Sequence, residues 1–591
     1  MMKTQTNLRK DSPADQPAEV NAGHTLMLGL LRAFLLITLL ASLSFGGPKL
    51  APDLPTDANA MVDVIVQFKT PPTKQELKQL GPYGQMKKVF QNINGANLQL
   101  PMSLVQALEN DPNVAYISPN RTSTGMLDIV TATVNAPSAW QLALDGTGVG
   151  VAVIDSGITP KDDLMMVDGV TPRIVYSESF IGISDTTDTY GHGTHVAGIV
   201  GGNGKDSTGL GFSRTYKGVA PNVNLINLRV LDQNGAGLEA NVIAAIDRAI
   251  QLKNTYNIRI INLSLGHPIY ESYTLDPLCQ ELEAAWKAGI IVVTAAGNFG
   301  RDYSHGTHGY GTIVSPGNDP YVITVGATKT NGTASRLDDS VASFSSKGPT
   351  LVDHIVKPDL MAPGNGVVSL LASPNSTLIQ TFPKTAVSTN NYETSGTYSA
   401  SVPNYFRLSG TSMAAPVVSG AAALLLQQQP FLTPDQVKAR LMKTAWKGLS
   451  KFSSGTDAIS MASFNSEDDI FTIGAGYLDI QAALANTDLV TLPALSPTAA
   501  YDPLAKTVSI VRDFSAIWGD SYLWRDSVVW GTAVFSSVTS KGYSVVWGDS
   551  IGAGFSVVWG DCTSSGFSVV WGSSVSGNSA MQAFSADDGD E

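Results

Sequence analysis

The middle of the chain alternates between short apolar runs and longer stretches with helical spacing. The runs are continuously apolar, which is typical of strands buried on both faces of a parallel sheet. They cover residues 149–154, 225–230, 258–263, 290–294 and 322–325. Residues 126–490 are therefore expected to form an α/β domain with a mostly parallel central sheet in three layers. Functional groups are expected beyond the C-terminal ends of its strands.

A shorter pattern precedes this region. Residues 62–68 and 114–117 are strand-like, residues 97–100 alternate, and residues 76–80 and 103–108 have helical spacing. Residues 62–120 are expected to form a small α+β domain. The polar stretch that follows, residues 119–125, suits a cleavage site.

The N-terminus carries an apolar run over residues 33–45, with Arg32 before it and Lys3, Arg9 and Lys10 further upstream. We interpret residues 1–47 as a signal peptide with small residues near a cleavage point. An uncleaved membrane anchor starting at Leu26 stays open, although Arg32 interrupts it. Either interpretation predicts that the rest of the chain is exported, as a secreted or a membrane-anchored protein.

Near the C-terminus, residues 510–575 hold six of the nine tryptophans. Three units of the type Gly-Phe/Tyr-Ser-Val-Val-Trp-Gly begin at Gly542, Gly554 and Gly566, 12 residues apart. These β-prone repeats are either an attachment to a cell surface, a polysaccharide or a partner chain (including self-association), or a structural tail that packs on itself or is removed in maturation. Exposed Val-Val-Trp would aggregate, so both alternatives require burial.

Composition narrows the classes of function. The formal net charge of −13, without a Lys/Arg cluster, argues against a nucleic-acid partner. The two cysteines, Cys279 and Cys562, offer no disulfide framework and are interpreted as separate thiols. The chain carries few charges and many glycines, as expected of a large core with tight turns.

Four polar residues lie at predicted strand ends or helix starts, where their side chains could take part in catalysis. Asp155 ends an apolar run and precedes Ser-Gly, and His192 stands in Gly-His-Gly-Thr-His-Val-Ala-Gly. Ser412 stands in Gly-Thr-Ser-Met-Ala-Ala-Pro, where Pro416 predicts a helix starting at about Ser412. A serine there can attack while its own N–H receives an oxyanion. Asn298 follows a strand and can donate a second such bond. Singly, each residue equally fits a turn cap or a structural role.

Together, the segments around these residues resemble the subtilisin-like serine proteases, the subtilase family, over residues 126–490. The order Asp, His, Ser is typical of that family, and the last histidine, His354, precedes Ser412, which excludes an α/β-hydrolase. The resemblance implies that Asp155, His192 and Ser412 form a catalytic triad and that Asn298 lines the oxyanion hole. It also implies that Ser264, Leu265 and Gly266 pair with the backbone of protein or peptide substrates.

The same resemblance implies that residues 62–120 are an inhibitory propeptide, a partner that the enzyme removes itself. It implies no required cofactor. Asp163 looks like one ligand of a structural calcium site in the family, but the loop 203–217 departs from the ligand pattern, so calcium is not assigned. No other metal is expected, and His305-Gly306-Thr307-His308 is interpreted as a loop. The Ser/Thr/Asn-rich insertion between Gly364 and Leu408 is interpreted as solvated. A binding scaffold with a vestigial protease fold is the competing hypothesis.

Overall fold

The computed structural model divides the chain into two compact units, residues 1–123 and 124–591. It describes residues 49–51, 54–55, 57–73, 85–90, 94–119, 127–166, 168–303, 307–394, 403–457, 460, 462–502, 507–511, 580–583 and 590. The predicted signal segment, the helix expected at 76–80, Cys562 and the tryptophan repeats lie outside these residues. Within them, no helix has the length and apolar character needed to cross a membrane.

The N-terminal unit is a four-stranded antiparallel sheet with one helix. The sheet has the order β2-β3-β1-β4, with β1 (Met61–Phe68), β2 (Gln85–Phe90), β3 (Gly95–Pro101) and β4 (Val114–Pro119). Every second residue of β1 is buried against the helix α3 (Met102–Leu108) and the other strands. The sequence did not indicate β2, because its residues are polar or exposed and leave no apolar periodicity.

The second unit is built on an eight-stranded sheet of order β13-β12-β11-β9-β5-β7-β6, with β14 also paired to β12. All of its pairings are parallel except β12 with β13, which confirms the expected parallel sheet. The strands are β5 (Gly150–Asp155), β6 (Ile174–Ser179), β7 (Asn224–Arg229), β9 (Ile258–Leu263), β11 (Ile291–Ala295), β12 (Ile323–Lys329), β13 (Ser340–Val341) and β14 (Leu360–Pro363). Most of their apolar residues are buried in one core, whereas those of β6 are only partly buried and Val341 and Met361 belong to a second cluster.

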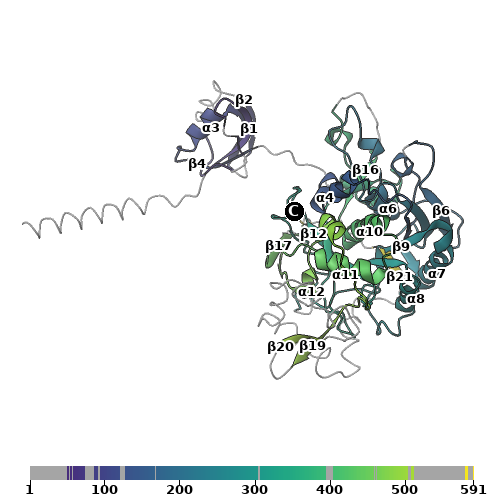
Figure 1. Ribbon diagram of the computed structural model, residues 1–591. Coiled ribbons are helices and arrows are strands. Elements are labelled where there is room, and N and C mark those ends of the chain that lie inside the picture. The colour runs from purple at the N-terminus through teal and green to yellow at the C-terminus, as the bar shows by residue number, and fades with distance from the viewer. Residues whose placement is uncertain are drawn as a thin grey trace, which may run out of the picture. The chain divides into compact units, whose positions relative to one another are not determined.

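Two pairs of helices cover this sheet. Helix α6 (His192–Gly201) packs against α10 (Thr411–Gln428), and α7 (Glu239–Tyr256) packs against α8 (Pro277–Lys287). Figure 1 shows the first pair on one side of β9 and the second pair on the other. The remaining helices are α4 (Leu127–Thr133), α5 (Ala136–Gln141), α9 (Thr377–Thr381), α11 (Pro434–Thr444), α12 (Ile470–Ile473) and α13 (Ile480–Ala485).

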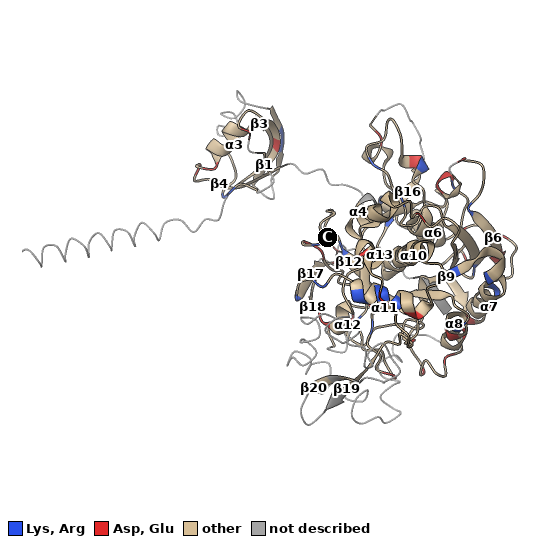
Figure 2. Cartoon of the chain, viewed as in Figure 1, with Lys and Arg blue, Asp and Glu red and all other residues tan. Residues whose placement is uncertain are grey.

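Helix α11 carries charges into the core. In Figure 2 it shows several Lys and Arg residues, and two of them, Lys438 and Arg440, are fully buried. A buried cation requires oxygen partners, so α11 must lie against a polar surface of the domain.

The interpretation of residues 364–408 as a solvated insertion was wrong for its two ends, which form buried strands, whereas residues 374–375 and 380–381 between them are exposed. β15 (Val367–Leu370) pairs antiparallel with β16 (Tyr405–Leu408), and both strands are largely buried. Tyr392 also packs at right angles against Tyr405, with ring centroids 5.4 Å apart. The count of Ser, Thr and Asn concealed these few large aromatic residues, whose burial decides the structure.

A three-stranded sheet lies apart from the central one, with the order β10-β21-β8. It joins β8 (Ala236–Leu238) and β10 (Leu265–Gly266) through β21 (Ala580–Ala583), the short yellow strand of Figure 1. Two further pairs are β17 (Phe452–Thr456) with β18 (Ser463–Glu467), and β19 (Thr498–Asp502) with β20 (Thr507–Val511).

Candidate active site

Three of the predicted residues lie at the ends of neighbouring strands. Asp155 is the last residue of β5, Ser264 follows β9 directly, and Asn298 lies three residues beyond β11. The strands β5, β9 and β11 are adjacent and parallel, so their C-terminal ends meet at one edge of the sheet. The sheet therefore gathers these side chains although Asp155 and Asn298 are 143 residues apart in the sequence.

His192 and Asp155 form a buried pair. Nδ1 of His192 lies 2.8 Å from Oδ1 and 3.0 Å from Oδ2 of Asp155, and both side chains are at most 1% exposed. His192 opens α6, so the approach of this helix to β5 sets the distance. A Cβ at Gly193 would lie 2.3 Å from the carbonyl oxygen of Gly157, so only glycine permits that approach.

A second carboxylate, Asp188, fixes the start of α6. Its Oδ1 accepts hydrogen bonds from the Gly191 N–H (2.6 Å) and the Ser156 hydroxyl (2.8 Å), and its Oδ2 accepts one from the Thr194 N–H (2.8 Å). Burial raises the pKa of Asp188, and these hydrogen bonds act against that rise. Asp188 is a positioning residue that sequence reasoning missed. The signal that could have found it was an aspartate three residues before the Gly191 that precedes the helix.

Ser412 lies in the first turn of α10, which begins at Thr411, one residue earlier than predicted. Pro416 lies inside the helix and not in its first turn, which corrects the placement inferred from the sequence. Pro416 has no N–H, so the Ser412 carbonyl four residues before it loses its helical donor. The Ser264 hydroxyl replaces that donor at 2.9 Å, and the Ser412 hydroxyl donates to the Ser264 carbonyl at 3.1 Å.

Asn298 contacts the residue before Ser412. Its Oδ1 accepts hydrogen bonds from the Thr411 N–H (2.9 Å) and the Thr411 hydroxyl (3.0 Å). With the oxygen held in this way, Nδ2 is the group of the amide that can donate elsewhere. The Ser412 N–H lies in the helix turn whose amides have no acceptor within the helix. The chain thus holds two donors near the Ser412 hydroxyl.

The structure does not show a hydrogen bond between Ser412 and His192. The Ser412 hydroxyl is bonded to Ser264, and Nε2 of His192 is buried without a partner in the described part of the chain. The two residues stand at the starts of α10 and α6, which pack against each other. Catalytic hydrogen bonds are often unmade before substrate binds, so this geometry is compatible with proton transfer from Ser412 to His192.

Comparison with known proteins identifies the family of this chain. Residues 146–474 match the model of the subtilase family. Serine protease AprX of Bacillus subtilis (strain 168) is 38% identical over 375 residues, which covers 62% of this chain and 77% of that protein. Subtilisin E of the same organism is 33% identical over 366 residues, or 61% of this chain and 78% of that protein. This chain belongs to the subtilase family.

A solved structure of a cold adapted subtilisin-like serine proteinase is also similar, at 30% identity and a TM-score of 0.37, over 52% of this chain and 86% of that one. The family membership makes this subtilase a serine endopeptidase with protein substrates.

The predicted calcium ligand of this subtilase is bound by donors of the protein. The Asp163 carboxylate accepts hydrogen bonds from the Tyr405 hydroxyl (2.8 Å) and the Asp206 N–H (2.7 Å), and its carbonyl accepts one from Arg173 (2.6 Å). Burial raises the pKa of Asp163 to about 7. Hydrogen-bond donors occupy the oxygens that a cation would need, so these contacts do not fit calcium. Among the described residues, no three His, Cys, Asp or Glu side chains are grouped to hold a metal.

Two other residues singled out from the sequence, His308 and Cys279, make contacts that indicate structural roles. His308 packs its ring against Tyr303 at a centroid distance of 4.8 Å, and its carbonyl accepts a hydrogen bond from Lys347; His305 lies outside the described residues. Cys279 is a buried free thiol on α8, and burial raises its pKa well above the ordinary value. Such a thiol is a weak nucleophile.

Proposed function

We propose that this subtilase cleaves peptide bonds through Ser412, with His192 as general base, Asp155 as the partner of the imidazole, and Asn298 as an oxyanion donor. The observation that carries this proposal is the buried pair of His192 and Asp155 beside a serine in the first turn of α10. Nε2 of this imidazole is buried and has no hydrogen-bond partner among the described residues, which leaves it available to take a proton and supports a proton-transfer role.

In the proposed mechanism, Nε2 of His192 takes the hydroxyl proton of Ser412 as the oxygen attacks the scissile carbonyl. Asp155 holds the proton on Nδ1 and stabilises the imidazolium that forms. The Ser412 N–H and Nδ2 of Asn298 receive the negative charge of the tetrahedral intermediate. His192 then protonates the leaving amine, and water hydrolyses the acyl-enzyme by the same steps in reverse order.

Substrate is expected to bind as an extended strand along Ser264, Leu265 and Gly266. The contacts of Ser264 with Ser412 support this, because they tie the position of β10 to that of the nucleophile. A peptide added to a sheet edge gains main-chain hydrogen bonds that do not depend on its sequence, which suits an endopeptidase of broad specificity.

The proposal includes export as a zymogen. The N-terminal apolar run supports export, and the separate compact unit of residues 1–123 is compatible with an inhibitory propeptide cut off near residues 119–126. Attachment to a cell surface or self-association through the repeats within residues 510–575 stays a proposal with no structural support of its own.

Two experiments test the proposal. A fluorophosphonate is expected to label Ser412 in the mature protein, and the absence of labelling would refute an active site at this residue. Self-processing predicts that Ser412→Ala accumulates as an uncut precursor in pure protein. Normal removal of residues up to about 126 in that variant would refute self-processing while leaving the active-site assignment intact.

A further inference from the structure

The substrate-binding strand of this enzyme already has a neighbour from its own chain. The strand β21 (Ala580–Ala583) lies between β10 and β8 and runs antiparallel to both. Ala583 is opposite Leu265 and Gln582 is opposite Gly266, while Ala580 is opposite Leu238. Both edges that could receive an extended peptide are therefore paired with one four-residue segment.

The direction of β21 matches that of an acyl donor. Leu265 is the residue next to Ser264, whose carbonyl accepts the hydrogen bond of the Ser412 hydroxyl at 3.1 Å. Ala583 pairs with Leu265, so the segment runs with its C-terminal end toward the nucleophile. A substrate must also present the carbonyl end of its strand to Ser412. The segment thus occupies the position and the polarity expected of the residues before a scissile bond.

A second attachment holds the same stretch of chain. The carboxylate of Asp590 accepts hydrogen bonds from the Ser343 N–H (2.6 Å), from the Ser343 hydroxyl and from Arg301 (3.0 Å). Asn365 binds the backbone of Asp590 on both sides, by donating to its carbonyl (3.0 Å) and accepting from its N–H (2.8 Å). The Asp590 side chain is fully buried. This is a built pocket that recognises the carboxylate and the main chain together.

We propose that residues 580–590 are an intramolecular competitive ligand of the substrate groove. This inference rests on the proposed function of Ser264, Leu265 and Gly266. Asp590 is the anchor, and six residues separate it from the strand. A tether of this length keeps the strand at an effective concentration of about 1 mM or more, so even weak pairing with β8 and β10 fills the groove.

Hydrogen exchange tests the occupancy without any need for catalysis. The full chain is treated with a fluorophosphonate to stop self-digestion, and deuterium uptake is followed by mass spectrometry in fragments that cover residues 580–583. We expect these amides to exchange at least about tenfold more slowly than an unstructured peptide. Asp590→Asn, which removes the charge facing Arg301, is expected to reduce that protection. Exchange at the unstructured rate in the unaltered chain would overturn the proposal.

Kinetics test the competition. Gln582→Pro removes an N–H from the central strand of the three-stranded sheet, a place that does not tolerate proline. Its matched control, Gln582→Ala, keeps the backbone donor. We expect Gln582→Pro to lower the KM for an internally quenched peptide about tenfold at unchanged kcat, and Gln582→Ala to leave both unchanged. A synthetic peptide of residues 578–585 should inhibit Gln582→Pro competitively.

The outcomes separate this inference from the proposed function. If wild type and Gln582→Pro hydrolyse the peptide with the same KM, the inference is wrong and the active site stands. If no variant hydrolyses peptide or takes up fluorophosphonate, the proposed function is wrong, and the exchange of residues 580–583 still decides whether the groove is occupied.

Discussion

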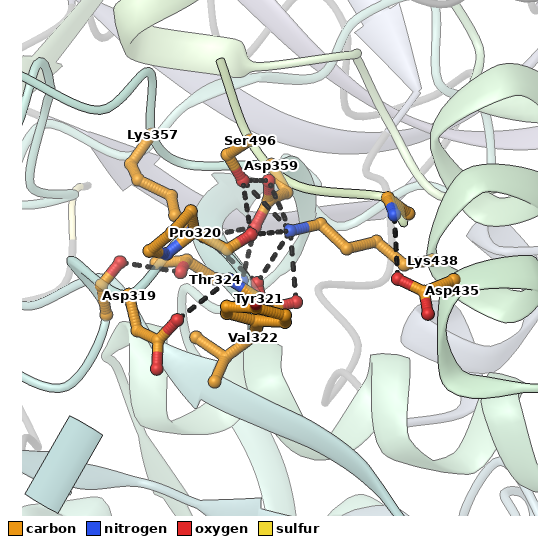
Figure 3. Close-up of polar contacts among 12 residues, drawn as sticks. Asp319, Pro320, Tyr321, Val322, Thr324, Lys357, Asp359, Asp435, Lys438 and Ser496 are labelled. Atoms are coloured by element: carbon orange, nitrogen blue, oxygen red, sulfur yellow. Dashed lines mark hydrogen bonds and ion pairs between the residues drawn. The ribbon is translucent and has the colours of Figure 1, made fainter. Parts of the chain in front are cut away.

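Two buried polar clusters in the same domain make opposite use of their charges. The first is the active-site cluster of Asp155 and His192. The second is the cluster around Asp359, in which Lys357 lies 2.7 Å and Lys438 3.4 Å from the carboxylate (Figure 3). All of these side chains are at most 1% exposed. Burial alone therefore does not distinguish a catalytic charge from a structural one.

The clusters differ in how completely their hydrogen bonds are made. Nζ of Lys438 donates to the carbonyls of Pro320, Tyr321 and Val322 and to the Ser496 hydroxyl, and Asp359 also accepts from Ser496 and the Thr324 N–H (Figure 3). In the active-site cluster, Nε2 of His192 is left without a partner within the described part of the chain. A saturated cluster stabilises one structure, whereas an unfilled position is available to a reacting proton.

The largest expected effect separates activity from stability. Ser412→Ala or His192→Ala should lower kcat about 10⁶-fold, a figure measured on subtilisin, a member of this family. For Ser412→Ala the free energy of unfolding should change by only about 1 kcal/mol, because Ser412 loses a single neutral hydrogen bond. Single-turnover hydrolysis and denaturant titration of the same preparations measure the two quantities. A loss of folding that matched the loss of activity would contradict the comparison.

The reverse behaviour is expected of Asp359→Asn. Removing the carboxylate leaves Lys357 and Lys438 buried without their counter-charge, which should cost about 3–5 kcal/mol of unfolding free energy. The kcat per labelled Ser412 should stay within about twofold of wild type, since the cluster touches no reacting group. Asp435→Asn is the matched control, because Asp435 bonds the neutral N–H groups of Trp286 and Ala494. An equal loss in both variants would show that the paired charges are not the cause.

Asn298 sharpens the comparison inside the active site. Asn298→Ala should lower kcat about 10²–10³-fold with little change in KM, as the equivalent donor does in subtilisin. Asn298→Asp keeps an oxygen for Thr411 but lacks the N–H donor. If Asn298 acts as an oxyanion donor, both variants lose activity alike. Recovery of activity in the aspartate variant would instead assign Asn298 to the positioning of Thr411.

The smallest effect is a dependence of stability on pH. Burial lowers the pKa of Lys438 to about 7, well below its ordinary value of 10.5. Between these two pH values the folded chain binds fewer protons at this site than the unfolded chain, so its stability rises with pH. The difference in unfolding free energy between wild type and Lys438→Met should therefore increase by about 1 kcal/mol per pH unit from pH 7 to 9. Urea titrations at these pH values measure the difference. If the difference in unfolding free energy between the two proteins did not change with pH, the expected rise would be contradicted.

Much of the catalytic unit could be predicted from local signals. The five predicted parallel strands begin within one residue of their observed starts, because continuous apolar runs have few alternatives to burial. The exposed β2 and the paired strands β15 and β16 could not be predicted in this way. Their formation depends on neighbours that are distant in sequence.

The active-site residues were also named from sequence, but Asp188 and the contacts of Ser264 were not. In the sequence Asp188 looks like any aspartate in a turn. Its role becomes visible only when the N–H groups of Gly191 and Thr194, at the start of α6, are seen to donate to its carboxylate. The replacement of the Pro416 donor by the Ser264 hydroxyl requires two segments 148 residues apart to meet. Contacts of this kind leave no periodic pattern in the local sequence, so they cannot be predicted from it.

The sequence by itself determined which residues are proposed to carry the chemistry and which runs form the parallel sheet, because residue types and burial periodicity are local properties of the chain. Only the tertiary structure decided what fills the space around them. It placed Ala580–Ala583 between β8 and β10, and it left Nε2 of His192 without a hydrogen-bond partner among the described residues while saturating Lys438. Strand pairing and hydrogen-bond saturation depend on groups brought together from across the chain, and no window of sequence contains both partners.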